Sequence, residues 1–236
     1  VSGVVGFGGG SSLDVAKLAA LLAASGQPLA EAYGIGNAKG PRLPLVLVPT
    51  TSGTGSEVTP ISIVTTGALE KMGVVSPLIL PDVAVLDPEL TLGLPAHVTA
   101  ATGIDAMVHA IEAYASANPN DNPVSRALAV EALRLMGRVL QRAVDTPGNI
   151  EARSDMMLGS MLAGQAFANS PVAAVHALAY PIAVPDTQPQ LPTNRLVHPP
   201  VLPSLCEYKP TAMYTYHLLR YDPNTCAPAY HHTACA

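Results

Sequence analysis

The sequence predicts an α/β layered segment followed by a segment built only of helices, and three patterns support this fold class. Short apolar runs at 1–7, 43–49 and 83–87 have the composition of buried parallel strands. The first two runs end in glycine-rich loops, and a helical pattern lies between them. From about residue 95 to about residue 182, apolar residues recur at three- and four-residue spacing instead.

Capping and breaking residues bound the predicted helices. The first helix covers 13–24 and is capped by Ser11 or Ser12. Asp14 suits its first turn, and Gly26 ends it. The later helices are separated by breaks that contain proline, and they cover 95–115, 124–144, 150–168 and 172–182.

These patterns divide the chain into three parts. We predict an α/β domain over 1–94, a helical domain over 95–182 and a divergent or irregular tail over 183–236. Prolines and histidines become frequent in the tail, and helical periodicity fades there. The first residue already lies in a predicted strand, so we expect the chain to be a fragment of a longer protein.

Composition narrows the possible classes of protein. A net charge of −5 and 12% charged residues argue against a nucleic-acid-binding surface. No uninterrupted apolar run is long enough for a membrane span. The three cysteines show neither zinc-type spacing nor a disulfide framework, which favours a reducing cytoplasm; they are Cys206, Cys226 and Cys235.

Two loops have the composition of phosphate-binding loops. Gly8 to Ser11 joins a predicted strand to a helix N-terminus, where glycines allow close approach and the helix dipole favours an anion. The usual G-x-G-x-x-G fingerprint is absent, and a glycine run before a helix is often only a tight turn. The second loop follows another buried strand, and its glycines alternate with four hydroxyl side chains, those of Thr50, Thr51, Thr54 and Ser56.

A carboxylate and an imidazole in the helical segment are candidate metal ligands. Asp105 and His109 are four residues apart, so both lie on one helix face. The surrounding segment is apolar, and a buried polar pair of this kind needs a strong partner such as a cation. His176 lies in another apolar helical stretch and is the natural third ligand. This donor set suits Fe(II) or Zn(II) without distinguishing between them.

Six segments resemble, in the same order, signatures of the iron-containing (group III) alcohol dehydrogenase family. They are GGGSSLDVAK, PTTSGTGSE, EKMGVVSP, LPDVAVLDPELTLGLP, TGIDAMVHAIEAYAS and VHALAYPI. The resemblance covers nearly all of 1–182. It implies an incomplete Rossmann-like nucleotide-binding domain followed by an all-α, dehydroquinate synthase-like metal domain, with the active site between them.

The resemblance also implies roles for particular residues. The pyrophosphate side of NAD or NADP would be held by Gly9, Gly10, Ser11 and Asp14. The rest of the cofactor would be contacted by Thr50, Thr51, Thr54, Thr59 and Lys71. Three of the four metal ligands of the family, which also carry catalysis, would be Asp105, His109 and His176.

Two departures from the family pattern affect these expectations. By the family pattern, we expect this chain to lack an earlier segment, which carries the first strands and an acidic residue selecting NAD over NADP, and most of the later helical domain. The fourth ligand of the family is a histidine fourteen residues after the third ligand, and here that position holds Gln190. A neutral amide oxygen is a weaker ligand than imidazole for iron or zinc.

Three functional hypotheses follow. The first is a metal-dependent, NAD(P)-linked oxidoreductase that transfers a hydride between nicotinamide and a small primary alcohol or aldehyde, and that forms homo-oligomers if complete. The second is a metal-free enzyme similar to maleylacetate reductases, which Gln190 favours. The third is a truncated, inactive chain that binds nucleotide or pairs with an intact homologue.

Overall fold

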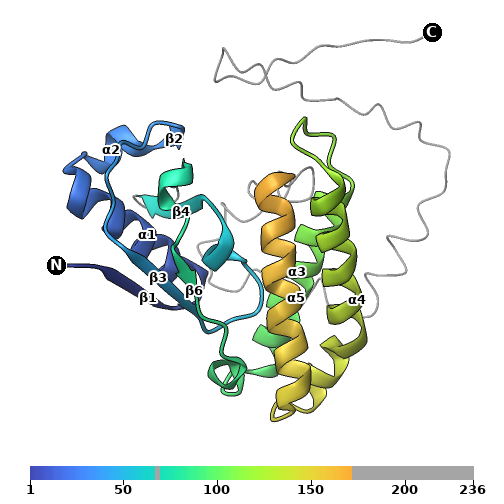
Figure 1. The fold of residues 1–236 in the computed structure, drawn as a ribbon. Helices are drawn as coiled ribbons and strands as arrows, with labels where there is room; N and C mark the ends of the chain where they lie inside the picture. Colours follow the sequence, from blue (N-terminus) through green and yellow to red (C-terminus); the bar gives the residue numbers. More distant parts are fainter. Residues whose placement is uncertain (67–69, 172–236) are drawn as a thin grey trace, which may run out of the picture. The chain divides into compact units, whose positions relative to one another are not determined.

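The structure, a computed structural model, describes residues 1–66 and 70–171, which all belong to one compact unit (Figure 1). An α/β part comes first in the chain and a part made of three long helices follows it. This is the predicted fold class. The predicted boundary near residue 94 falls between the last 3-10 turn, Pro88–Thr91, and α3, Ala96–Tyr114.

The first sheet is parallel, and its three strands stand in the order β1-β3-β6. The strands are β1 (Val4–Gly8), β3 (Leu45–Pro49) and β6 (Val83–Ala84). Helix α1 (Gly10–Ser25) covers one face through a cluster of buried aliphatic residues: Leu13, Ala16, Ala20, Leu45 and Leu47. The fit is close, since a Cβ at Gly6 would lie only 2.6 Å from Leu47 Cδ2 and 2.7 Å from Ala16 Cβ.

The start of α1 differs from the prediction. The helix begins at Gly10 with Gly9 as its N-cap, and no side chain caps it. The predicted cap at Ser11 or Ser12 is therefore wrong, because the glycine run itself turns into the helix and leaves both serines inside the first turn. The predicted end is confirmed: Gly26 is left-handed with φ 66°, and its N–H donates to the Leu22 carbonyl.

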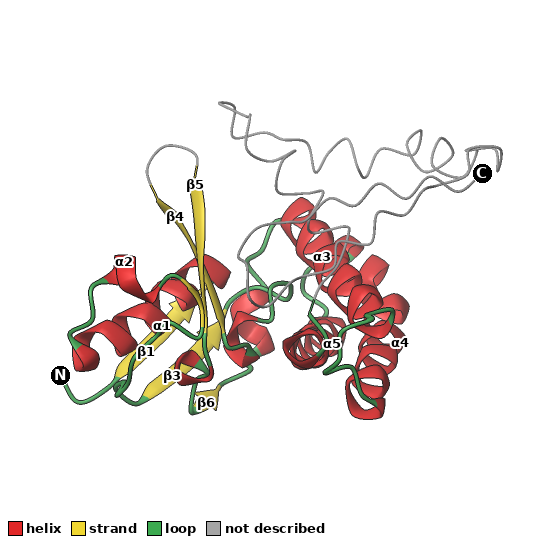
Figure 2. Ribbon diagram, turned by 90° about the horizontal axis from the view of Figure 1, so that it is seen from above, coloured by secondary structure: helices red, strands yellow, loops and turns green. Residues whose placement is uncertain are grey.

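A second sheet has the strand order β2-β5-β4. The sequence did not predict it, because its strands are not continuous apolar runs. Strands β4 (Ile61–Thr66) and β5 (Glu70–Val75) form an antiparallel hairpin (Figure 2). Strand β2 (Gly34–Ile35) pairs in parallel with β5. Hydroxyl residues interrupt the first hairpin strand, and a lysine and a glycine interrupt the second, so neither reads as a continuous apolar run. Short turns complete this part: α2 (Leu29–Ala32), η1 (Ser56–Val58) and η2 (Pro77–Ile79).

Helices α3, α4 (Pro123–Asp145) and α5 (Ile150–Asn169) pack on one another and match the predicted ranges to within one residue at each end. Their shared core is rich in alanine and methionine, including Ala106, Ala132, Met136, Met156 and Phe167. Among the described helices, none combines the length and apolar character needed to cross a lipid bilayer. The predicted helix over 172–182 and the predicted tail over 183–236 lie outside the described residues.

A buried arginine near the start of α5 forms a hydrogen bond with a residue near the start of α3. Arg153 is 2% exposed; its Nη1 donates to Thr99 Oγ1 at 2.7 Å and its Nε to the Pro147 carbonyl at 3.0 Å. Burial lowers the pKa of its guanidinium from the ordinary value. These bonds join α3 to the turn between α4 and α5, and so fix the helix that carries Asp105 and His109.

Candidate functional site

The two glycine-rich loops lie against each other at the carboxyl ends of β1 and β3. These strands are parallel neighbours, and the Thr50 amide donates to the Gly8 carbonyl at 2.9 Å. A Cβ at Gly10 would lie 2.7 Å from Thr54 Cγ2, and one at Gly9 would lie 3.7 Å from Thr51 Cγ2. Glycine at position 10 therefore allows the hydroxyl loop to approach the start of α1 closely.

The chemistry of this edge suits an anion. The N-terminus of a helix of this length carries a partial positive charge and points its first N–H groups outward. The Ser11 side chain is exposed beside it, and those of Thr50, Thr51 and Thr54 are partly exposed. Hydroxyl groups and main-chain amides from two adjacent strand ends could together hold a phosphorylated ligand.

Asp14 on α1 bonds to the second loop and to the hairpin from within the protein. Its Oδ1 accepts from Ser56 Oγ at 2.5 Å, and its Oδ2 accepts from the Ile63 amide at 2.9 Å. Its Oδ1 also lies 3.5 Å from Lys17 Nζ. The Asp14 carboxylate therefore bonds to the second loop and to β4.

Lys17 and Glu57 are buried behind the loops. Lys17 is fully buried, and its Nζ donates to Thr59 Oγ1 at 3.2 Å and to the Ile61 carbonyl at 2.6 Å. Burial lowers the pKa of Lys17 to about 8, although Asp14 and Glu57 oppose this. Burial raises the pKa of Glu57, which is 3% exposed, while its own amide and Lys17 oppose the rise. The Thr59 hydroxyl thus bonds inside the protein too.

The low pKa of Lys17 predicts an alkaline stability effect. Because the folded pKa of about 8 lies below the usual 10.5, the unfolded chain binds the extra proton between these values. The unfolding free energy should therefore rise with pH in this window, by at most about 1.4 kcal/mol per pH unit. The measurement is the difference in urea unfolding free energy between the wild type and Lys17→Met across that window. The exposed Lys39→Met variant is the control, and a difference that is flat or falls with pH would contradict the prediction.

Asp105 and His109 lie one turn apart on α3, as predicted. His109 is 8% exposed and Asp105 is partly buried. The Phe167 ring on α5 stacks on the His109 imidazole, with centroids 4.6 Å apart and planes 29° apart. Glu112, buried at 5% exposure, shares this helix face and was not singled out from the sequence, although its spacing of three after His109 signals it.

The predicted ligands are only partly within the described residues. Within the described residues, no group of three or more His, Cys, Asp or Glu side chains is arranged to hold a metal ion. The predicted third ligand His176 and the ligand position Gln190 lie outside the described residues. Asp105 and His109 still offer one oxygen and one nitrogen donor from a single helix face, a pair that fits a divalent metal.

The second loop also packs directly on the helices. A Cβ at Gly53 would lie 2.7 Å from Thr102 Cβ, one turn before Asp105 on α3. A Cβ at Gly55 would lie 2.6 Å from Gly164 Cα on α5, and Gly55 itself is left-handed with φ 61°. The loop predicted to hold cofactor therefore contacts both helices that carry the His109–Phe167 stack. No pattern in the sequence shows these contacts.

Lys71 lies apart from the two loops in the topology. It is exposed on β5, where it pairs across the hairpin with Thr65. The structure therefore places it on the second sheet, and its predicted contact with a cofactor stays a prediction.

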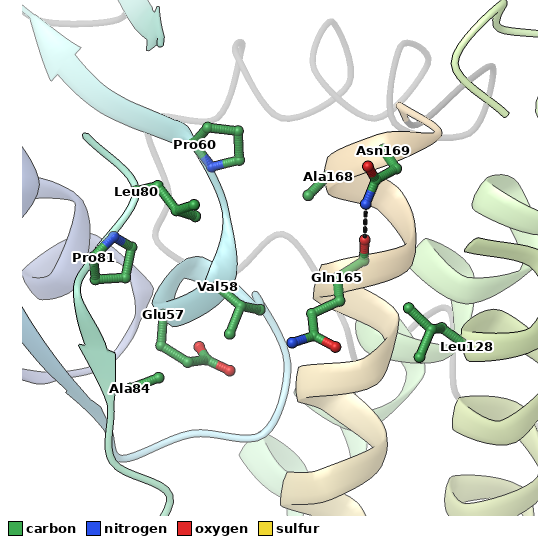
Figure 3. A pocket seen from close by; sticks show the side chains of 10 residues that line it. All are labelled: Glu57, Val58, Pro60, Leu80, Pro81, Ala84, Leu128, Gln165, Ala168 and Asn169. Atoms are coloured by element: carbon green, nitrogen blue, oxygen red, sulfur yellow. Dashed lines mark hydrogen bonds between the residues drawn. The ribbon is translucent and has the colours of Figure 1, made fainter. Parts of the chain in front are cut away.

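A cavity of about 550 Å³ lies on the other side of α5 (Figure 3). Figure 3 shows the side chains of Glu57 and Val58 facing those of Gln165 and Asn169 across it. The last two occupy the helix face opposite Phe167, as the helical period requires. This cavity is therefore separate from the His109–Phe167 stack.

Two family models match the chain in succession. The model described as iron-containing alcohol dehydrogenase matches residues 1–88. The model for the C-terminal part of the Fe-containing alcohol dehydrogenase family matches residues 99–207. The second match includes the positions of all the predicted metal ligands.

Known proteins of this kind are similar over most of the chain. Long-chain-alcohol dehydrogenase 1 of Geobacillus thermodenitrificans is 51% identical over 185 residues, covering 76% of this chain and 45% of that protein. The NAD-dependent methanol dehydrogenase of Bacillus methanolicus is 41% identical over 180 residues, covering 76% of this chain and 47% of that protein. The solved sulfoacetaldehyde reductase of Bifidobacterium kashiwanohense in complex with NAD+ has a TM-score of 0.72 and 38% identity, covering 77% and 48%. The chain thus spans about half the length of the relatives it matches.

Proposed function

Because the chain belongs to the iron-containing alcohol dehydrogenase family, we propose that it serves metal-assisted, NAD(P)-linked hydride transfer between nicotinamide and a small primary alcohol or aldehyde. The observation that carries this proposal is the contact of the second loop with α3 at Thr102. It brings the candidate cofactor loop to within one helical turn of Asp105. The nicotinamide that accepts the hydride and the metal-held alcohol that donates it must be neighbours, and this packing supports such an arrangement.

The cofactor phosphates are proposed to lie over the two loops. Gly9 and Gly10 allow close approach at the N-terminus of α1, and Ser11 adds an exposed hydroxyl. The hydroxyls of Thr50, Thr51 and Thr54 would contact the remainder of the cofactor, together with Lys71 from the hairpin. Asp14 and Thr59 form hydrogen bonds with other side chains of the protein. We therefore propose that they stabilise the loops from the protein side.

Asp105 and His109 are proposed to hold the metal, Fe(II) or Zn(II), with His176 as third ligand. When bound, such an ion would polarise the alcohol oxygen and lower its pKa, while nicotinamide would accept the hydride. Asp105 and His109 would place the ion, and Phe167 would cover the imidazole and keep water from that side. The position of Gln190 would supply at most an amide oxygen.

The test combines cofactor binding, metal removal and turnover. Saturating NADH or NADPH should raise the thermal midpoint, since a ligand at about 100 times its Kd stabilises the native state by about 2.7 kcal/mol. Chelation should remove oxidation of a short primary alcohol, and added Fe(II) should restore it. Turnover that survives exhaustive chelation would instead support the metal-free reductase. A midpoint that neither nucleotide moves would contradict cofactor binding altogether.

A further inference from the structure

One aromatic ring lies close to both the candidate cofactor loop and the candidate metal ligand. Phe167 on α5 is 6% exposed, and its ring stacks on His109 with centroids 4.6 Å apart. A Cβ placed on Gly55 would lie 3.5 Å from Phe167 Cε1. A single side chain is therefore in contact range of both the second loop and the imidazole.

The surrounding contacts leave little room for independent movement. The second loop meets α5 backbone to backbone at Gly55 and Gly164, and it meets α3 at Gly53 and Thr102. Protein interiors at such density shift rather than compress. A change in the loop must therefore be passed to α5, and with it to the Phe167 ring.

The imidazole needs an external constraint. The terminal torsion of histidine has broad, roughly two-fold minima, so the side chain alone does not fix the ring plane. A flat ring stacked at 29° restricts that torsion. Phe167 thus helps to decide where the donor nitrogens of His109 point.

We propose that Phe167 is a positioning residue that orients the His109 imidazole and couples cofactor binding at the second loop to metal binding at His109. The proposal rests on the proposed function, because it needs a nucleotide on the loop and a metal at His109. A nucleotide that shifts Gly55 would shift Phe167, and the shifted ring would favour the metal-binding orientation of the imidazole. By linkage, the metal must tighten nucleotide binding by the same factor.

The test measures the Co(II) dissociation constant with and without saturating NADH, using Co(II) as the spectroscopic probe. In the wild type, NADH is expected to tighten Co(II) binding by about fivefold or more. In Phe167→Leu, which keeps an apolar side chain without a flat ring, the ratio should fall to about one and the visible Co(II) spectrum should shift. Phe7→Leu is the matched control, since Phe7 is the other phenylalanine of the chain and is 61% exposed on β1. It should keep the wild-type ratio and spectrum.

The possible outcomes distinguish a failure of the coupling role of Phe167 from a failure of the proposed function. If the wild type binds both ligands and the ratio is one, or if Phe167→Leu keeps the wild-type ratio, the coupling role is overturned while the proposed function stands. If the wild type binds no Co(II) or no NADH, the proposed function fails and the inference fails with it. Should Phe167→Leu not fold, Phe167→Met is measured against the same criteria, because its flexible chain also lacks a ring face.

Discussion

His109→Ala is expected to abolish metal binding and turnover while leaving nucleotide binding nearly intact. The imidazole is one of the two proposed metal ligands on α3, and the substitution removes it outright. Loss of groups that merely orient a ligand costs about 10- to 100-fold in metal affinity, so loss of the ligand itself should cost at least about 100-fold. The loops at the ends of β1 and β3 do not include His109, so the NADH dissociation constant in the absence of metal should change little.

The measurement pairs a metal titration with an NADH titration on the same protein. His97→Ala is the matched control, because His97 is an exposed histidine in the first turn of the same helix. It should retain the metal affinity and turnover of the wild type. A His109→Ala protein that loses NADH binding along with the metal would contradict this division of labour between loops and helix.

Gly55→Ala is expected to be among the most destabilising single substitutions in the described part of the chain. Gly55 has φ 61°, a conformation that costs an L-residue roughly 1–2 kcal/mol. Its new Cβ would lie 2.6 Å from Gly164 Cα, where main chain rather than a flexible side chain would have to move. Overpacking of this kind adds about 1–3 kcal/mol, so the unfolding free energy should fall by roughly 3 kcal/mol.

Urea unfolding with Gly137→Ala as control would check this expectation. Gly137 is exposed inside α4, and a Cβ there would meet nothing within 4 Å. That substitution should raise the unfolding free energy by about 0.5–1 kcal/mol, because glycine is a poor helix former. A Gly55→Ala protein as stable as the wild type would show that the loop can leave α5 without cost.

The parts of the fold that sequence predicts are those determined by neighbours along the chain. Periodicity locates α3, α4 and α5 because each buries one face continuously, and a left-handed glycine such as Gly26 ends a helix through local geometry. The strand-to-helix glycine run is equally local. The predicted cap at Ser11 or Ser12 is wrong because the helix already begins at Gly10, so a glycine occupies the position where a polar cap was expected.

The parts that sequence could not predict depend on distant partners. Asp14 reads as a first-turn acid or a cofactor ligand, yet Ser56 and the Ile63 amide take its oxygens. The sequence around Lys17 indicates that it is buried, because it stands between buried Ala16 and Leu18 in an apolar helix. Nothing in the sequence indicates that its hydrogen-bond acceptor lies on β4, since the hairpin does not read as an apolar run.

The contact between Gly55 and Gly164 also bears on the order of folding. These residues belong to elements far apart in the chain, and such long-range contacts form only after the loop-closure entropy of the intervening segment has been overcome. The strands and α1 find their partners within residues 1–90, whereas the left-handed turn at Gly55 gains its packing partner only when α5 is present. During synthesis from the N-terminus, the second loop would therefore reach its final shape last among the elements of the α/β part, after the ribosome has released the third long helix.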